Sequence, residues 1–201
     1  MAHAAIPPDQ ALAMLMQGNQ QWVTGQMQHP NQTPERRLEV APHQDPFAVV
    51  FSCIDSRVPP EIVFDRGVGD LFVIRSGAQV LDTGVVFGSI QFGPNGYPSA
   101  RLIVVLGHEG CGAITAAIKV FQTGVAAPAY IQAVVAALRP AYDMVVGQGG
   151  DLVDNMVRAQ VQLTVNALRN DPLIANLIST QGLAVVGGRY GLASGIVELI
   201  A

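Results

Sequence analysis

The sequence has few charges, two cysteines and no long apolar run. Its 11 Lys and Arg residues are outnumbered by 15 Asp and Glu, and a net charge of -4 excludes the basic surface that nucleic-acid binding requires. Apolar runs such as Leu102 to Leu106 are far shorter than the roughly 18 residues of a membrane span, so we expect no membrane association. The start of the chain, Met1 to Asp9, lacks the basic and apolar regions of a signal peptide. We therefore expect a cytoplasmic protein with reduced cysteines.

The composition is that of a folded chain with a substantial core. Hydrophobic residues make up 50% of the 201 positions and charged residues 13%, which excludes disorder, and the length fits one domain. The mean hydropathy of +0.34 is high for so few charges. Such an apolar excess favours a large interface between subunits over tight packing of a monomer. We therefore expect a homo-oligomer.

The first part of the chain, residues 1–46, predicts a helical arm. Residues 9–24 carry apolar side chains on one side, with Asp9 as the predicted N-cap and Gly25 as the end of the helix. Residues 26–46 are rich in Gln, Pro and His and predict an extended connection with a helical turn at 34–38.

From residue 47 the pattern becomes that of an α/β domain spanning 47–201. Continuous apolar runs, typical of strands buried on both faces, occupy residues 47–51, 71–74, 102–106 and 183–186. Helical patterns lie between these runs, at residues 80–92, 112–122 and 151–170. This alternation predicts a mainly parallel central β-sheet flanked by helices, and the tail at 190–199 predicts a turn and an antiparallel edge strand. Gly187 and Gly188 indicate room for close packing.

Both cysteines and one histidine lie where predicted strands end. Cys53 and His108 follow the first and third apolar runs, and Cys111 comes three residues after His108, at the start of a predicted helix. Because the carboxyl ends of parallel strands meet at one edge of a sheet, we expect the three side chains to converge. Two thiolates and an imidazole suit tetrahedral Zn²⁺, and three protein ligands leave the open position of a catalytic zinc site.

Asp55 decides whether such a site is open. It lies two residues beyond Cys53 and returns to the same side of an extended chain. Its carboxylate has two possible partners: the metal, which would close the site, or Arg57, which would hold it as an anion in a bidentate pair. The sequence leaves both partners open.

With these motifs in view, the sequence resembles the β-class carbonic anhydrases over nearly its whole length. The resemblance is carried by the strings at residues 18–25, 53–61, 69–75, 107–113 and 189–195. It implies zinc on Cys53, His108 and Cys111, and a catalytic pair, Asp55 and Arg57, that orients the zinc-bound hydroxide. It also implies a homodimer or a dimer of dimers, with N-terminal helices that reach across to the partner subunit.

One string departs from the family pattern. The family usually has Arg, then Asn or Thr, then Ala and Gly after the second strand, whereas this chain has Arg75, Ser76, Gly77 and Ala78. We expect different contacts around the pocket at this loop and an unchanged metal site.

The resemblance implies reversible hydration of CO₂ to bicarbonate and a proton by a zinc lyase, which would serve carbon utilization or pH balance. Two other interpretations remain: a related hydrolase that acts on CS₂ or COS at the same zinc site, and a non-catalytic protein that binds zinc or bicarbonate. A nucleotide-binding domain is excluded, because no Gly-x-Gly-x-x-Gly string follows the first predicted strand. His29 and His43 are candidates for moving the product proton, and the sequence favours neither.

Overall fold

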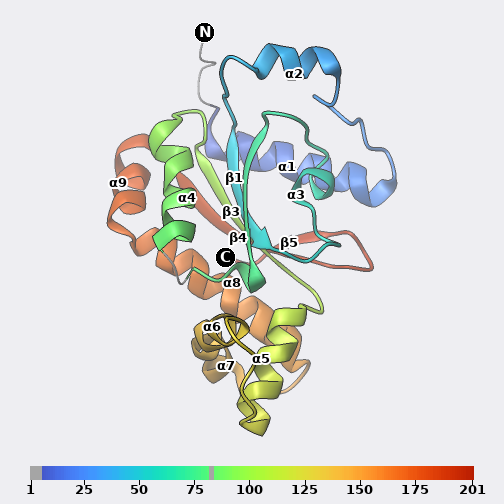
Figure 1. The fold of residues 1–201 in the computed structure, drawn as a ribbon. Helices are drawn as coiled ribbons and strands as arrows, with labels where there is room; N and C mark the ends of the chain where they lie inside the picture. The colour runs from blue at the N-terminus through green and yellow to red at the C-terminus, as the bar shows by residue number, and fades with distance from the viewer. Residues whose placement is uncertain (1–5, 82–83) are drawn as a thin grey trace.

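A computed structural model describes residues 6–81 and 84–201, and it contains one five-stranded sheet (Figure 1). The strands are β1 (Ala48–Cys53), β2 (Leu71–Ser76), β3 (Leu102–His108), β4 (Ala184–Tyr190) and β5 (Val197–Leu199). They lie in the order β2-β1-β3-β4-β5, with parallel pairing except between β4 and β5, which are antiparallel. The predicted α/β class, mainly parallel sheet and antiparallel C-terminal edge strand are confirmed.

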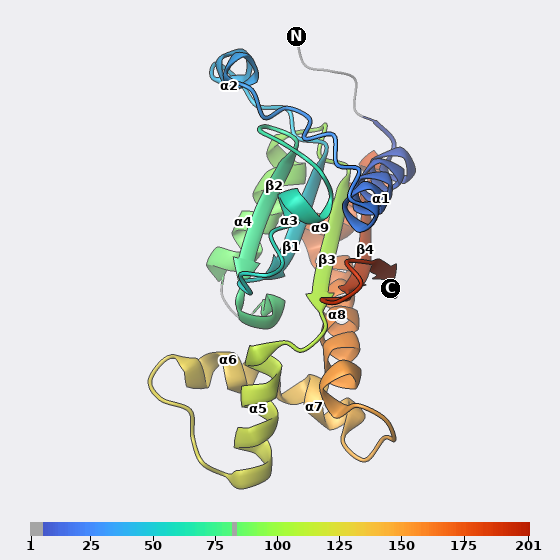
Figure 2. The ribbon, with the colours of Figure 1, turned by 90° about the vertical axis from the view of Figure 1, so that its right-hand side faces the viewer.

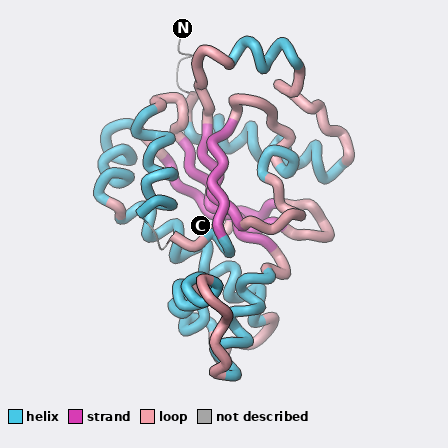
Figure 3. Tube along the Cα trace, viewed as in Figure 1, coloured by secondary structure: helices cyan, strands magenta, loops and turns pink. Residues whose placement is uncertain are grey.

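Helices cover both faces of this sheet (Figures 2 and 3). They are α1 (Pro8–Thr24), α2 (Pro34–Val40), α3 (Pro60–Val63), α4 (Gly84–Gly96), α5 (Gly112–Thr123), α6 (Ile131–Ala137), α7 (Arg139–Val145), α8 (Leu152–Asn170) and α9 (Pro172–Gln181). One apolar cluster joins α1 and α3 to one face, and a second joins α4, α8 and α9 to the other. Within the described part of the chain, no helix is both long enough and apolar enough to cross a membrane.

A third apolar cluster lies beyond the carboxyl ends of the strands. It joins α5, α6, α7 and the first half of α8 into a helical lobe, which projects past the end of β3 in Figure 2. The cluster includes Cys53 and Cys111, so the lobe forms one wall around the end of the sheet where the candidate ligands lie.

Burial follows position in the sheet. Every residue of the central strands β1 and β3 is buried, as their continuous apolar runs predict. The residues of β2 are only partly buried or exposed, because this strand forms an edge and has a neighbour on one side only. The sequence run alone does not distinguish a central strand from an edge strand.

Two predicted helix starts were wrong. Helix α1 begins at Pro8 with Pro7 as N-cap and no side-chain cap, so Asp9 lies in the first turn, where its charge favours the helix dipole. The helix expected from residue 80 begins at Gly84, since the chain first forms a 3₁₀ turn, η1 (Gly77–Gln79). Residues 82–83 of that expected helix, and residues 1–5 of the expected arm, lie outside the described residues.

Several predicted helix ends agree with the structure. Gly25 ends α1 in the left-handed conformation (φ 68°), as expected. Asp151, the first residue of the helix expected at 151–170, is the N-cap of α8, and its side chain accepts a hydrogen bond from the Val153 N–H. Asp171 follows the end of α8, as expected, but its side chain also caps α9, a helix that the sequence did not predict. The expected turn at 34–38 is the longer helix α2.

Helix α8 lies close to the sheet because glycine faces it there. A Cβ atom at Gly187 on β4 would lie 2.6 Å from Val161 Cγ1, and one at Gly107 on β3 would lie 2.6 Å from Val161 Cγ2. Both distances are far below van der Waals contact, so neither position accepts a larger residue without moving the helix. The predicted close packing at Gly187 is confirmed, and at Gly107 it occurs directly before His108.

Helix α1 is fixed to the sheet through a buried amide, Asn19. Its Nδ2 donates hydrogen bonds to the carbonyl oxygens of Val63 (3.1 Å) and Gly195 (2.8 Å), and its Oδ1 accepts one from the Val197 N–H (2.9 Å). The apolar side chains of α1, including Leu15, pack on the sheet of the same chain. Asn19 thus connects the N-terminal helix with α3 and β5.

We expect Asn19→Leu to lower the free energy of unfolding by at least about 3 kcal/mol, because it leaves two carbonyls and one N–H buried without partners. Urea unfolding at one fixed protein concentration measures the effect, and Gln20→Leu, at the exposed neighbouring position, is the control. A loss for Asn19→Leu no larger than for this control would contradict the role of the amide.

Candidate metal centre

The ends of two strands and the start of one helix bring Cys53, His108 and Cys111 together. Cys53 ends β1, His108 ends the neighbouring strand β3, and Cys111 is the N-cap residue of α5. All three side chains are buried, and one ligand atom from each lies within 4.8 Å of the other two. The convergence expected from the carboxyl ends of parallel strands therefore occurs.

The spacing of the sulfurs fits a shared metal ion. The two Sγ atoms are 3.9 Å apart, far longer than the roughly 2.05 Å of a disulfide bond. Two bonds of about 2.3 Å from sulfur to one tetrahedral zinc ion would place the sulfurs about 3.8 Å apart. The cysteines are therefore arranged as a pair of metal ligands, and both are free thiols.

The imidazole of His108 also has one nitrogen available for a metal. Its Nδ1 lies 2.8 Å from the backbone oxygen of Glu109, and this contact favours the tautomer that carries the proton on Nδ1. Its buried Nε2 has no hydrogen-bond partner among the described residues. A buried nitrogen without a partner is unfavourable in a protein interior unless a ligand completes it, so the donor set fits Zn²⁺.

The polar surroundings stabilise thiolate at this centre. The hydrogen bond between the two cysteines lowers the pKa of Cys53 and raises the pKa of Cys111, so thiolate is favoured on Cys53. The N–H of Ala78 donates to Cys53 Sγ at 3.3 Å, and the N–H groups of Ala113 and Ile114, at the start of α5, act in the same direction on Cys111. Binding of a cation would displace the remaining proton.

Asp55 pairs with Arg57 in this structure. The guanidinium donates from Nε to Oδ1 (2.9 Å) and from Nη2 to Oδ2 (2.8 Å), and the Arg57 N–H donates to Oδ1 (3.0 Å). These bonds hold the pKa of Asp55 well below its usual range. The same Oδ2 lies 3.8 Å from His108 Nε2, so an ionised carboxylate borders the point where the three ligands meet.

A second arginine fixes the backbone around the pair. Arg75, on the neighbouring strand β2, donates from Nε to the Cys53 carbonyl (2.8 Å) and from Nη2 to the Asp55 carbonyl (2.6 Å). Arg75 lies in one of the strings that carry the resemblance, at residues 69–75, but residue patterns alone gave it no role. Side-chain bonds to distant carbonyls leave no signal in the local sequence.

The loop that departs from the family pattern keeps a conformation that glycine favours. Ala78 adopts a left-handed φ of 51° at the position where the family usually has Gly, and it is this residue whose N–H reaches Cys53 Sγ. Gln79 is also left-handed, with φ 44°. The exchange of Gly and Ala along this string therefore leaves the contact to the sulfur in place.

The centre opens to a cavity of about 480 Å³. The cavity is lined by Cys53, Ile54, Asp55, Ser56, Arg57, Gly112 and Ala113. A small molecule can therefore reach the sulfur and the carboxylate from outside. His29 and His43 are exposed and do not line this cavity, so its geometry gives neither histidine a place in proton transfer.

The chain matches known proteins over nearly its whole length. The family model described as carbonic anhydrase matches residues 48–197. Carbonic anhydrase 2 of Mycobacterium tuberculosis is 38% identical over 189 residues, which cover 94% of this chain and 90% of that protein. The carbonic anhydrase of Mycolicibacterium smegmatis is 38% identical over 193 residues, with 96% and 93% covered.

Solved structures share the fold at lower identity. A tetrameric β-carbonic anhydrase of the ascomycete Sordaria macrospora superposes with a TM-score of 0.75 at 20% identity, covering 96% of this chain and 98% of that one. The β-carbonic anhydrase CafA of Aspergillus fumigatus superposes with a TM-score of 0.73 at 23% identity, covering 95% and 89%. From the family match, the curated relatives and the shared fold, the chain belongs to the β-class carbonic anhydrases, a family of lyases.

Proposed function

We propose that the protein catalyses the reversible hydration of CO₂ to bicarbonate and a proton with one zinc ion held by Cys53, His108 and Cys111. The observation that carries this proposal is the arrangement of three buried ligand atoms within 4.8 Å beside a carboxylate that is already bound to an arginine. A structural zinc site would use that carboxylate as its fourth ligand. Its pairing with Arg57 supports an open, catalytic site.

Zinc bound at this site supplies the Lewis acidity that makes water nucleophilic at neutral pH. Asp55 orients the attacking water. Its Oδ1 accepts two hydrogen bonds from Arg57 and its Oδ2 only one, so Oδ2 retains the capacity to accept a hydrogen bond from that water. Arg57 keeps the carboxylate ionised and away from the metal ligands, and its planar fork fixes the direction of Oδ2.

The walls of the cavity suit a small apolar substrate. Ile54 is exposed there, and Gly112 and Ala113 present little bulk, so a linear molecule such as CO₂ can approach the ligands. CS₂ and COS have the same linear shape, and a hydrolase of either remains the second candidate.

We expect removal of the metal to abolish CO₂ hydration, because the proposed reaction depends on the Lewis acidity of the metal to activate water. Stopped-flow measurement of hydration before and after dialysis against dipicolinate tests this, and one equivalent of Zn²⁺ is expected to restore the rate. Parallel assays with CS₂ and COS separate the second candidate. Hydration that persists in metal-free protein, or inactivity of zinc-loaded protein toward all three substrates, would contradict the proposal.

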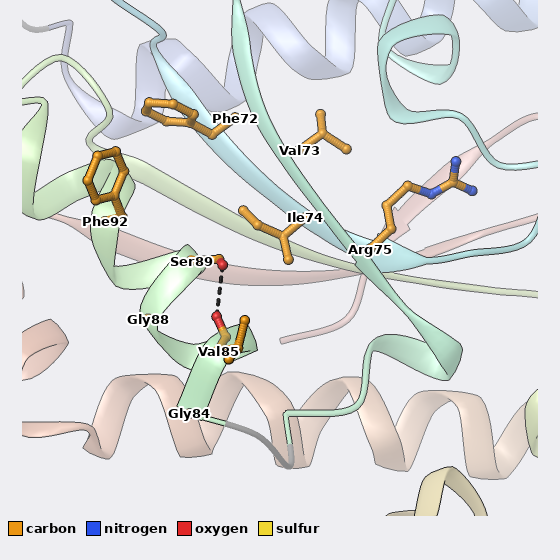
Figure 4. Close-up of a pocket in the computed structure, with 9 residues that line it drawn as sticks. All are labelled: Phe72, Val73, Ile74, Arg75, Gly84, Val85, Gly88, Ser89 and Phe92. Carbon is orange, nitrogen blue, oxygen red and sulfur yellow. Dashed lines mark hydrogen bonds between the residues drawn. The ribbon is translucent and has the colours of Figure 1, made fainter. Parts of the chain in front are cut away.

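We propose a homodimer, or a dimer of dimers, with the edge strand β2 and helix α4 at the subunit contact. A cavity of about 640 Å³ on this face has Phe72 and Phe92 side by side at one end, whereas Arg75 points away from them (Figure 4). Val85 is 79% exposed and Phe92 60% exposed, which is unfavourable for a surface facing water. Sedimentation equilibrium tests the proposal, and a monomer at micromolar concentration would contradict it.

We also propose a division of the chain into two parts, a cellular location and a physiological role. Residues 1–46 would form the arm and 47–201 the zinc-binding α/β domain of one folded unit, located in the cytoplasm and acting in carbon utilization or pH balance. Limited proteolysis of the zinc-loaded protein tests the division of the chain, because an independent arm would be cleaved near residue 46 while the rest stays intact. Fractionation of the source cells tests the location.

A further inference from the structure

The orientation of the His108 ring depends on a peptide carbonyl. The hydrogen bond at Nδ1 goes to the backbone oxygen of Glu109, 2.8 Å away, and the nitrogen that remains for the metal is Nε2. Partners of this kind fix the tautomer and the direction of a ligating histidine. Whatever holds the peptide between Glu109 and Gly110 therefore also holds the ring.

That peptide is held by the segment that follows β4. The N–H of Glu109 donates to the Tyr190 carbonyl (2.8 Å), and the N–H of Leu192 donates to Glu109 Oε2 (2.9 Å). The Leu192 side chain also covers Gly110, with its Cδ1 atom 3.6 Å from the place a Cβ would occupy. Residues about 80 positions apart in the chain thus form one clamp around the turn after His108.

The carboxylate of Glu109 restrains the peptide between Glu109 and Gly110, which the backbone bond to Tyr190 does not. The bond to Tyr190 fixes only the N–H side of Glu109, whereas the carbonyl belongs to the next peptide. That peptide precedes Gly110, which has a φ of 59° and, as a glycine, wide rotational freedom. Without the bond from Leu192 to Oε2, this peptide can rotate and turn its oxygen away from Nδ1.

We propose that Glu109 is a positioning residue for His108. Its side chain binds the Leu192 N–H, and this bond fixes the carbonyl that orients the imidazole toward the metal. The proposal rests on the metal site of the proposed function and adds a residue that touches neither the metal nor the substrate. It also gives the segment Arg189 to Leu192, at the end of the neighbouring strand β4, a role in the centre.

The wider ion-pair network supplies a matched control. Arg189 lies 3.8 Å from Glu109 Oε1 and donates to Asp154 (2.6 Å), and Asp154 in turn pairs with Arg158 (2.9 Å). Glu198 pairs with Arg158 (2.7 Å) at the other end and makes no contact with the turn after His108 among the described residues. Loss of Glu198 therefore perturbs the same network without releasing the carbonyl.

The test compares zinc-loaded wild-type protein with Glu109→Ala, Glu109→Gln and Glu198→Ala. Competition with a chromophoric chelator at one pH gives the zinc dissociation constant of each. We expect Glu109→Ala to weaken zinc binding by about tenfold, at the lower end of the effects of outer partners on metal ligands. Glu109→Gln keeps an oxygen that can accept from Leu192, so it is expected to retain nearly wild-type affinity, as is Glu198→Ala.

A spectroscopic measurement separates positioning from general stability. In the cobalt-substituted proteins, the visible absorption bands report ligand geometry. Glu109→Ala is expected to shift them, whereas Glu109→Gln and Glu198→Ala are not. If Glu109→Ala does not fold, Glu109→Asp replaces it, because the shorter side chain keeps the charge but falls short of the Leu192 N–H. The same loss of affinity and the same shift are expected for Glu109→Asp.

Two results would overturn the proposal while leaving the proposed function intact. One is wild-type affinity and unshifted cobalt bands in the variants that lose the bond to Leu192. The other is equal weakening by Glu198→Ala, which would assign the effect to the network as a whole. Wild-type protein that binds no stoichiometric zinc would instead overturn the metal site itself, and with it both proposals.

Discussion

Asp55→Ala is expected to lower kcat for CO₂ hydration by about 10²–10⁴-fold, the effect of losing a group that accepts or orients a proton in the reaction. Zinc content is expected to stay near one equivalent, because the carboxylate is bound to Arg57 and lies 3.8 Å from the nearest ligand nitrogen. Stability is expected to change by less than about 1 kcal/mol, since Arg57 is 56% exposed and its charge remains hydrated.

The control for this variant is Asp143→Ala. Asp143 forms a comparable pair with Arg139 (2.7 Å) on the surface of α7, in the helical lobe, so its loss removes an ion pair without changing the centre. Activity measured by stopped flow and zinc measured by mass spectrometry separate catalysis from metal binding. An Asp55→Ala variant with the wild-type rate would remove Asp55 from the mechanism.

Cys111→Ser is expected to abolish both zinc binding and activity. A serine hydroxyl stays protonated at neutral pH, so the variant loses one of the two anionic ligands that match a zinc ion. The N–H groups at the start of α5, which stabilise negative charge on the sulfur, would then face a neutral oxygen. Metal analysis after desalting measures the loss.

Ala113→Ser is the matched control, because it places a hydroxyl two residues further along, on the wall of the same cavity, and leaves the ligands in place. We expect this control to retain one equivalent of zinc. Stoichiometric zinc in the Cys111→Ser variant would mean that Cys111 is not a ligand.

The central part of the fold could be predicted because burial on both faces leaves a continuous apolar run. The runs that became β1 and β3 end just before Cys53 and His108, and parallel pairing then places both residues at one edge of the sheet. The amphipathic pattern of α8 and the end of α1 at Gly25 could be predicted for a related reason, since each depends on neighbours in sequence.

Other features could not be predicted because they depend on tertiary contacts. Helices α6, α7 and α9 are short, with 7, 7 and 10 residues, and such lengths give weak periodicity. The 3₁₀ turn η1 precedes α4, and its residues Ala78 and Gln79 are left-handed, a conformation that neither residue type predicts. The clamps made by Arg75 and Glu109 join residues 20 to 83 positions apart, beyond the range of any local pattern.

The hydrogen bond from the Ala78 N–H to Cys53 Sγ has an electronic consequence. A donor aimed at a thiolate withdraws electron density from it, so the sulfur becomes a weaker base and neutralises less of the positive charge of a bound cation. Two sulfurs would otherwise make that cation a poorer acid than three imidazoles would. The N–H group at this turn thereby offsets part of the electron donation from the two sulfurs to the cation.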